Sequence, residues 1–449
     1  YINNSQLTNL DVSSNSNLFA LKYAGNPNLV TVNQKNGVAN TDYLDFQAEN
    51  NPNLQFVCED ESNVVFLNNY FETENMSVNV NSYCSFVPNG DYNEITGNVT
   101  YSVNGVEEDI VSSFLKVSIS DGLETGATFV NTESEYLYYA GAGNFTVLPS
   151  VENPSYFNIN PIEAEINFPN PGGATETQDF TITPNGVHND VEVVLASTLP
   201  ARPGFDAEYL IVYKNKGNLT ASGEINFTYN EDVLDYISST DVPTVQSSGS
   251  LSWNYVDLLP FESRSFTVAL NVNSPMEIPA VNIDDVLNFS TTINPADIDD
   301  SPEDNEFNLE QVVIGAYYPN DITCLEGSVL EPSYIGKYLH YLINFENTGN
   351  APAENVVVKM DVDTNLYNLD SLQLLTSSHD IDVRIDGNTV EFIFESIFLE
   401  ALGKGHLVFK IKSQDALQVG DSVTQNAGIF FDFNFPVITN TASTTFAVL

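Results

Sequence analysis

The sequence has very little positive charge. It contains 13 Lys and Arg residues against 61 Asp and Glu residues in a chain of 449, and its formal net charge is -48 at pH 7. A surface this negative repels phosphate backbones and anionic lipid headgroups, so we expect neither a nucleic-acid partner nor attachment to an anionic membrane. The same charge favours solubility in a salty medium, or divalent cations as counterions. An acidic solvated surface is the simpler interpretation.

Cysteine is scarce as well, and no long apolar run is present. The three cysteines form no C-x-x-C pair and no histidine lies close to them in the sequence, so no zinc-binding pattern is recognised. Cys58 and Cys84 are near enough to predict a disulfide if the chain is exported, which leaves Cys324 as a buried thiol. No apolar stretch approaches the about 20 residues of a transmembrane helix.

Catalytic motifs are missing too. There is no G-x-S-x-G, H-E-x-x-H or phosphate-binding loop, and acidic pairs at glycosidase-like separations are expected by chance among so many carboxylates. The single tryptophan, Trp253, lies in an alternating segment and is expected in a sandwich core. The chain is therefore predicted not to be an enzyme. The histidines are scattered at His188, His340, His379 and His406.

The opening segment repeats with an 11-residue step, and two units make a 22-residue turn. Each turn would place apolar residues of a short strand inward, while asparagines of the same period satisfy backbone groups at the bends. Residues 58–84 are expected to cap this solenoid, and further repeats are expected before Tyr1, where the chain begins without a leader sequence. The recurring residues are Leu7, Leu18 and Leu29, then Leu10, Leu21 and Val32, and Asn15 with Asn26.

From about Asp91 the apolar residues alternate with a period of two, which predicts short strands. A second repeat follows, because Tyr209–Asn218 aligns with Tyr341–Asn350. No helix longer than two turns is expected, and no long flexible linker separates the modules, so they are expected to stack as a semi-rigid rod. The predicted domains of this all-β chain are 1–84, 85–187, 188–316 and 317–449.

Calcium is the one chemical hypothesis that the residues support. Several carboxylates crowd a single loop between strands, and hard oxygen ligands at close spacing suit Ca²⁺. The loop lacks the full spacing of a calcium-binding loop, so a solvated acidic loop is the alternative. A similar segment, Asp380–Gly387, is interpreted as part of a β-hairpin. The predicted ligands are Asp297, Asp299, Asp300, Glu303 and Asp304, and no other cofactor is expected.

Parts of the chain resemble known families of bacterial surface proteins. The phrase at Leu7–Asn15 resembles leucine-rich repeats of secreted and surface proteins of the Bacteroidota. Residues 91–187, with Ile95–Val99 and Gly143–Val147, resemble small transthyretin-like or collagen-adhesin B-type domains. The two later copies, with strings such as Asp432–Pro436, are similar to the conserved-repeat immunoglobulin-like domains of flavobacterial proteins exported by the type IX secretion system.

The resemblance implies a short leucine-rich-repeat solenoid followed by three immunoglobulin-like β-sandwiches, outside the cell or on its outer surface. It also implies passage through the type IX machinery, with a C-terminal sorting domain removed on export. The expected function is an adhesive or structural stalk whose repeat face binds a protein or glycan ligand. The alternative is an accessory binding or spacer region of a larger secreted polysaccharide-degrading enzyme.

Overall fold

The structure is a computed structural model that describes residues 1–449 except residues 4, 16, 19, 38–45, 89–90, 104, 110–114, 124, 171 and 449, with the backbone alone described at 106–109. Nearly all of its regular secondary structure is β-strand, and the described residues contain one α-helix. No helix in this part of the chain combines the length and the apolar character needed to cross a membrane.

The N-terminal unit, residues 1–88, coils so that four short strands stack in parallel. Asn9 pairs with Thr31, Thr31 with Phe56, and Phe56 with Asn79. Asn9 and its partner Thr31 are 22 residues apart, which is the length of one turn that the sequence repeat predicts. The middle residue of each strand is apolar and buried, so these side chains form the core of the unit. The strands are β1 (Asn9–Asp11), β2 (Thr31–Asn33), β3 (Phe56–Cys58) and β4 (Asn79–Asn81).

Two buried asparagines satisfy backbone groups at successive bends of this coil. The side-chain amide of Asn26 donates to the Tyr23 carbonyl at 2.6 Å, and its backbone N–H donates to the Asn51 side-chain oxygen at 2.7 Å. The Asn51 amide in turn donates to the carbonyls of Tyr23 and Ala48. The predicted role of these asparagines is therefore confirmed at Asn26 and Asn51. The exposed Asn15 makes the same local contact, because its side-chain amide donates to the Val12 carbonyl at 3.3 Å.

A helix, α1 (Glu61–Thr73), covers the end of the coil, so the expectation that no helix exceeds two turns is wrong. The segment contains three asparagines and two adjacent valines, which are weak helix formers. Leu67 and Phe71 lie four residues apart and are both buried against the coil. Tertiary packing of this apolar stripe therefore stabilises a helix that local propensity does not favour.

The second module, residues 91–187, is a β-sandwich with one core. The long strand β5 pairs with β6 and β9 in antiparallel fashion and with β13 and β14 in parallel, while the opposite sheet has the order β12-β10-β7-β8. A short 3-10 turn, η2 (Pro154–Tyr156), precedes β11. The strands are β5 (Asn93–Val103), β6 (Val106–Asp109), β7 (Lys116–Ser120), β8 (Thr125–Phe129), β9 (Glu135–Ala140), β10 (Gly143–Ser150), β11 (Phe157–Asn160), β12 (Ala164–Phe168), β13 (Thr175–Thr177) and β14 (Phe180–Pro184).

The third module, residues 188–316, is a sandwich of two sheets. Their orders are β15-β16-β21-β18 and β19-β20-β17-β22-β23. A 3-10 turn, η3 (Pro302–Asp304), precedes the last strand. The strands are β15 (Val191–Leu199), β16 (Asp206–Asn215), β17 (Ala221–Thr228), β18 (Leu234–Ser239), β19 (Val245–Ser247), β20 (Ser250–Leu258), β21 (Ser263–Val272), β22 (Val286–Pro295) and β23 (Glu306–Val312).

The last module, residues 317–449, repeats this topology. Its orders β24-β26-β31-β28 and β29-β30-β27-β33-β34 match those of the third module strand for strand, and a small sheet β25-β35-β32 is added. The turn η4 (Pro332–Tyr334) precedes β26. The strands are β24 (Asp321–Cys324), β25 (Val329–Leu330), β26 (Tyr338–Glu346), β27 (Val356–Asp361), β28 (Tyr367–Ser377), β29 (Asp382–Asp386), β30 (Thr389–Phe394), β31 (Lys404–Ser413), β32 (Ser422–Gln425), β33 (Gly428–Phe431), β34 (Val437–Ile438) and β35 (Ala442–Phe446).

The repeated string of the sequence occupies equivalent strands, β16 and β26, and each strand leads into the same buried asparagine turn. The side-chain amides of Asn215 and Asn347 each donate to the carbonyl four residues later and to a second carbonyl in a distant loop. The side-chain oxygen of each accepts the backbone N–H two residues later. The two modules thus share a local hydrogen-bond pattern as well as a sheet order.

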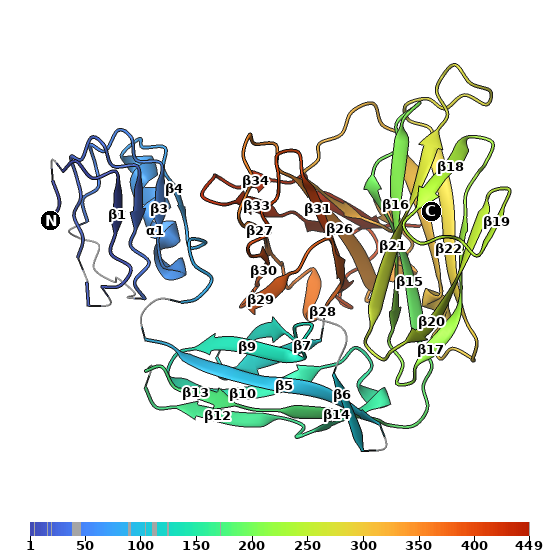
Figure 1. Ribbon diagram of the computed structural model, residues 1–449, viewed down its shortest axis with the longest axis horizontal. Coiled ribbons are helices and arrows are strands. Elements are labelled where there is room, and N and C mark those ends of the chain that lie inside the picture. Colours follow the sequence, from blue (N-terminus) through green and yellow to red (C-terminus); the bar gives the residue numbers. More distant parts are fainter. Residues whose placement is uncertain are drawn as a thin grey trace.

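The modules do not form a rod; the last module lies at the centre and the chain folds around it (Figure 1). Its edge strand β29 pairs with β8 of the second module, where Arg384 is opposite Thr128 and Asp386 is opposite Gly126. One nine-stranded sheet therefore runs through both modules. The prediction of a rod is wrong because the length of a joint does not reveal which strand edges, distant in sequence, will pair.

Apolar contacts cross the other junctions as well. Leu342 and Val408 of the last module belong to the core of the third module, and Phe261 of the third module belongs to the core of the second. Tyr83 of the N-terminal unit packs with Val357 of the last module. Since these side chains are all buried, the four parts are held by continuous apolar packing rather than by linkers.

Gly126 on β8 tests whether the shared sheet holds the second and last modules together. A Cβ at this position would lie 2.6 Å from the Tyr138 hydroxyl and 3.0 Å from the Ile385 carbonyl oxygen. We expect Gly126→Ala to cost about 1–3 kcal/mol and to increase amide exchange in β29. Gly141→Ala is the control, because nothing lies within 4 Å of its Cβ position. Equal effects of the two variants in urea unfolding would contradict the prediction.

Candidate functional site

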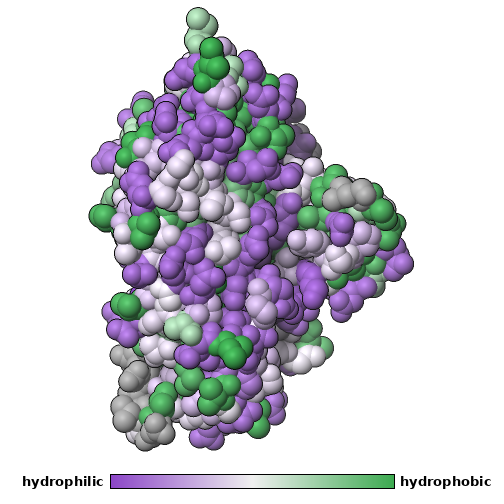
Figure 2. Space-filling model, turned by 90° about the vertical axis from the view of Figure 1, so that its right-hand side faces the viewer, coloured by the Kyte–Doolittle hydropathy of each residue, from purple (hydrophilic) through white to green (hydrophobic). Residues whose placement is uncertain are grey.

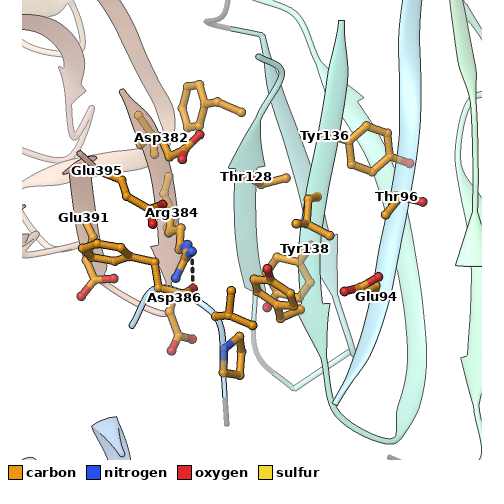
Figure 3. Close-up of a pocket in the computed structure, with 18 of the residues that line it drawn as sticks. Glu94, Thr96, Thr128, Tyr136, Tyr138, Asp382, Arg384, Asp386, Glu391 and Glu395 are labelled. Atoms are coloured by element: carbon orange, nitrogen blue, oxygen red, sulfur yellow. Dashed lines mark hydrogen bonds between the residues drawn. The ribbon is translucent and has the colours of Figure 1, made fainter. Parts of the chain in front are cut away.

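A groove of about 1020 Å³ lies where the N-terminal unit, the second module and the last module meet (Figure 3). Ligand pockets commonly measure about 300–1,000 Å³, so the groove has room for a ligand larger than a small metabolite. Ten charged side chains line it, and eight of them are acidic. They are Asp60, Glu61, Glu94, Glu135, Asp382, Asp386, Glu391 and Glu395, with Lys35 and Arg384 as the two cations.

One wall of the groove is formed by β5 and β9 of the second module. Tyr136 turns into the sandwich and is buried, whereas Leu137, the next residue of β9, is 41% exposed. Glu94 and Thr96 of β5 lie on the same outer face as Leu137, because they are paired with the outward-facing residues of β9. Polar, acidic and apolar side chains therefore alternate across this wall.

The facing wall is the hairpin of β29 and β30, which the sequence predicts correctly. Arg384 of β29 donates to the Phe86 carbonyl of the N-terminal unit at 2.6 Å (Figure 3). Its guanidinium also lies 5.8 Å from the centre of the Tyr139 ring of the second module. One arginine thus contacts both other modules and joins the walls of the groove.

Burial alters the acidity of several groove carboxyls. It raises the pKa of Asp382, of Asp60 and of Glu391, although Glu391 also accepts a 2.6 Å hydrogen bond from the Tyr83 hydroxyl. Burial also opposes ionisation of Glu61, but the Lys359 ammonium 2.8 Å away, with Ser82 and Lys35, outweighs it and lowers the pKa. At neutral pH the excess of carboxylates leaves the groove strongly negative, so it favours a cationic ligand.

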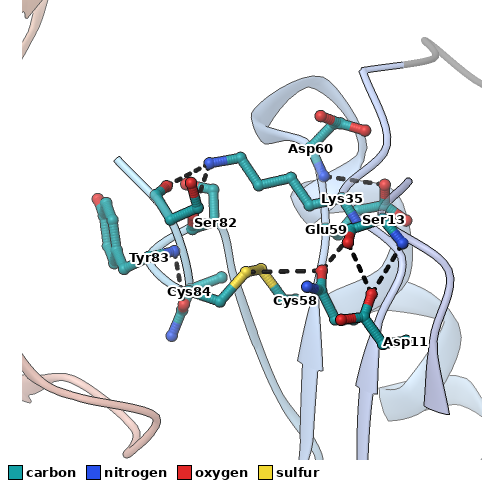
Figure 4. Close-up of a disulfide and its surroundings, with 12 residues drawn as sticks. Asp11, Ser13, Lys35, Cys58, Glu59, Asp60, Ser82, Tyr83 and Cys84 are labelled. Atoms are coloured by element: carbon teal, nitrogen blue, oxygen red, sulfur yellow. Dashed lines mark hydrogen bonds between the residues drawn. A yellow bond between two sulfur atoms is a disulfide. The ribbon is translucent and has the colours of Figure 1, made fainter. Parts of the chain in front are cut away.

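The rim of the groove on the N-terminal unit is held by a disulfide and a buried lysine (Figure 4). The sulfur atoms of Cys58 and Cys84 are bonded to each other in the structure. Lys35 reaches past the disulfide and donates to the carbonyls of Ser82 at 2.9 Å and of Ser85 at 2.5 Å. Burial lowers the pKa of Lys35 to about 8. The segment that leads into the second module is therefore tied to the coil at three points.

A second concentration of charge is buried at the junction of the second, third and last modules. Lys410 of β31 is 1% exposed, and its ammonium lies 2.6 Å from Glu152 and 2.5 Å from Glu192. Glu152 also lies 3.4 Å from Lys214. Burial disfavours every one of these charges, but Lys410, Lys214 and Lys216 together outweigh it and lower the pKa of both glutamates. These contacts join three modules through charge pairs that water does not screen.

Lys216 extends the network toward the solvent. Its ammonium lies 3.0 Å from Asp190 and also pairs with Asp304 of η3. The network therefore contains four carboxylates and three ammonium groups, an excess of one negative charge. Burial raises the pKa of Asp304 to about 7, since its carboxylate is partly desolvated beside this excess.

Asp304 should make the stability of the chain depend on pH near neutrality. Its folded-state pKa of about 7 lies above the ordinary value of 3.8, so the folded chain holds a proton that the unfolded chain releases. The free energy of unfolding should therefore fall as the pH rises from about 4 to about 7. Asp304→Asn mimics the protonated carboxyl and should reduce this dependence in urea titrations, whereas Glu303→Gln should leave it intact. Parallel pH profiles of Asp304→Asn and the wild type would contradict this.

The structure places three of the five predicted calcium ligands in other interactions, and the other two, Asp297 and Glu303, are exposed. Asp299 accepts the backbone N–H groups of Val191 and Ser301, and Asp300 lies 2.6 Å from a His188 nitrogen. Asp304 pairs with Lys216, as described above. Among the residues that the structure describes, no group of three His, Cys, Asp or Glu side chains could hold a metal ion. Calcium binding at this loop stays a prediction, and a rise in unfolding temperature on adding calcium after chelation would test it.

The remaining reactive side chains are engaged in the fold. Cys324 is buried, and burial raises the pKa of its thiol, which keeps it protonated. His340 lies on β26, as predicted, with its ring nitrogen 2.5 Å from Glu326. Trp253 is 4% exposed and donates to the Asp241 carbonyl, so its predicted place in a sandwich core is confirmed.

The third module faces the viewer in Figure 2. Hydrophobic residues on this face lie scattered among hydrophilic ones. The exposed apolar residues of the third module include Val242, Val245 and Val256. Scattered exposed apolar residues are normal on a solvated surface.

One family model matches part of the chain. A family model described as "Domain of unknown function (DUF7619)" matches residues 318–445, which correspond to the last module. The comparison with curated proteins finds no match.

Several solved structures are similar to the chain at low identity. The major pilin subunit of Bacillus cereus is 11% identical, with 79% of this chain and 95% of that chain covered and a TM-score of 0.21. The collagen adhesin of S. aureus is 12% identical, with 57% and 92% covered and a TM-score of 0.21. A DUF3823 family protein from Parabacteroides merdae is 11% identical, with 50% and 100% covered and a TM-score of 0.20. Scores this low do not establish a shared fold along the chain.

Proposed function

We propose that this chain is a non-enzymatic extracellular protein with an adhesive or structural role. The observation that carries the proposal is the central position of the last module, which joins the second module through one sheet and the third through buried charge and apolar contacts. Such an assembly keeps surfaces of different modules at fixed distances. A protein that bears load or presents a composite binding surface needs this rigidity.

Two features support a place outside the cell. The Cys58–Cys84 disulfide suits an oxidising compartment, and the net charge of -48 suits a soluble protein in a salty medium. The resemblance to flavobacterial exported proteins adds the type IX route and immunoglobulin-like modules to the proposal. The parallel strands and asparagine bends of the N-terminal unit support its interpretation as a leucine-rich-repeat solenoid, whose strand face would meet a protein or glycan.

Binding without turnover tests this function. The full chain should bind intact cell surfaces or members of a panel of matrix proteins and polysaccharides, and it should release no soluble product from them. Heat-unfolded chain is the control, because the composite surface is lost on unfolding. Release of sugars or peptides by the folded chain, or an absence of binding across the whole panel, would contradict the proposal.

A further inference from the structure

We propose that the groove docks an extended segment of a partner protein that carries Lys or Arg, and that this segment adds as a strand along the free edge of β9. The inference names a partner class for the adhesive role proposed above and rests on that role. It depends on three observations: the direction of the backbone groups of β9, the course of the groove along that edge, and the sign of the charge around it.

The backbone of β5 shows which groups of β9 lie on its open edge. The backbone N–H of Glu94 and the carbonyl of Thr96 form hydrogen bonds on the β13 side of β5. In a strand, alternate residues direct their backbone groups to opposite edges, so these two residues do not bond β9. Their opposite partners, Tyr139 and Leu137, therefore direct their own N–H and carbonyl groups away from β5. Among the described strands, β5 is the one that pairs with β9.

The groove follows this open edge. It is lined by five consecutive residues, 135–139, of β9. Side chains of consecutive residues point to opposite faces of a strand, so a cavity that meets all of them passes around the edge of β9. From this edge the groove also extends over the outer face of the sheet, to Glu94 and Thr96 of β5. A partner strand here would find the N–H and carbonyl groups of Leu137 and Tyr139 as hydrogen-bonding sites.

The last module already forms an edge-to-edge pairing of this kind within the chain. The β29 edge is completed by β8, which comes from another module and is distant in sequence. Addition of a strand to β9 would use the same backbone chemistry between two proteins instead of within one.

Charge decides which partner fits. Eight carboxylates and two cations surround the groove, so an extended segment with Lys or Arg side chains is complementary to it. A second copy of this chain is disfavoured, because it has only 13 Lys and Arg residues and would bring a net charge of -48. The ring of Tyr139, which already faces Arg384, offers a further contact to an arriving cation.

Binding of short peptides to the full chain tests the proposal. The probe is a fluorescent peptide of about nine alternating Lys and Thr residues, long enough to span β9 at about 3.3 Å per residue. Two peptide controls have Glu in place of Lys, or N-methyl groups on alternate backbone nitrogens that remove the donors. Fluorescence anisotropy should show saturable binding of the Lys peptide, weaker binding of the methylated peptide, and no binding of the Glu peptide.

Charge variants separate the groove from the acidity of the whole surface. Glu135→Gln, Asp386→Asn and Glu395→Gln combined remove three exposed groove carboxylates, and we expect about tenfold weaker binding. The control combines Glu163→Gln, Glu310→Gln and Glu400→Gln, three exposed acids that do not line the groove, and changes the net charge equally. Equal effects of the two triple variants, or no binding by the wild type, would overturn the proposal.

A backbone variant separates strand addition from simple charge attraction. Leu137→Pro removes an N–H on the open edge of β9, where an edge strand tolerates proline. It should weaken binding of the Lys peptide, and hydrogen exchange of the wild type should show protection at residues 135–139 on binding. If both the variant and the methylated peptide bind normally, strand addition is wrong. If the groove variants leave binding of the chain to cell surfaces unchanged, this inference fails while the adhesive function stands.

Discussion

Replacing Lys410 with methionine should destabilise the chain by about 3–5 kcal/mol. The variant keeps most of the buried hydrocarbon stem but leaves Glu152 and Glu192 without the ammonium that lies 2.6 Å and 2.5 Å from them. Buried carboxylates without a partner are costly to ionise, so the junction of three modules should open first. Urea unfolding followed by fluorescence of Trp253, the single tryptophan, measures this loss in the third module.

Lys412→Met is the matched control for this variant. Lys412 lies on the same strand, and its ammonium is 4.8 Å from the Tyr338 ring centre. Because it is less buried, its loss should cost below about 1 kcal/mol. Adding Glu192→Gln to Lys410→Met should recover part of the stability, since it removes a carboxylate that has lost its partner. Equal costs for the two lysine variants would show that the buried network contributes little.

The pH range of the network follows from the shifted pKa values. Lys410 lowers the pKa of Glu152 and Glu192 below their ordinary 4.5, so their contribution is complete above pH 4.5 and is lost as the pH falls through the lowered values. The two glutamates raise the pKa of Lys410 above 10.5 despite its burial, so its contribution is complete below pH 10.5. The difference between wild type and Lys410→Met should therefore be largest between these limits.

Loss of the disulfide should have the next largest effect, confined to the N-terminal unit. Cys58 and Cys84 close a loop with a sequence separation of 26 residues, and a crosslink of this length stabilises by about 3 kcal/mol through the unfolded chain. The double variant Cys58→Ala/Cys84→Ala should also loosen the segment that Lys35 holds at Ser82, which borders the groove. Hydrogen exchange with mass spectrometry should locate the loss of protection within residues 1–88.

A different cysteine controls for the loss of a buried sulfur atom. Cys324→Ala removes a buried thiol of the last module that forms no disulfide, so it measures the packing cost alone. Treatment of the wild type with reductant should reproduce the effect of the double variant. Cys324→Ala should instead lower the stability of the last module and leave the protection of residues 1–88 unchanged. A loss of protection spread evenly over all four modules would contradict a local role for the disulfide.

Periodic patterns in the sequence predict those parts of the fold that depend on neighbouring residues. The 11-residue step predicts the parallel coil with Asn26 at a bend, and alternation predicts the hairpin of β29 and β30 and the buried place of Trp253. In each case the sequence pattern and the structure that it predicts involve the same short segment of the chain. Helix α1 was not predictable in this way, because its residues favour a helix only when Leu67 and Phe71 pack on the coil.

Such patterns do not predict the groove, although one of its residues belongs to a pair of adjacent tyrosines in the sequence. Tyr139 follows Tyr138 in the sequence, and two such neighbours on a strand point to opposite faces. Its contact with Arg384 brings together residues of two modules, and Phe86 from a third completes the site. No spacing rule connects three such distant segments, so the acidic groove is visible only in the folded chain.

The sequence by itself determined the acidic surface, the β-rich modules and the internal repeat, since composition and short-range periodicity specify them. Tertiary structure alone decided how the modules are arranged. The pairing of β29 with β8 uses backbone groups, which every edge strand has, so the side-chain sequence does not specify the partner. Tertiary structure also decided where charge is buried: Lys410 and Glu152 are 258 residues apart and meet at one junction. A charged residue looks the same in sequence whether it is solvated or buried, and only the packing of whole modules distinguishes the two.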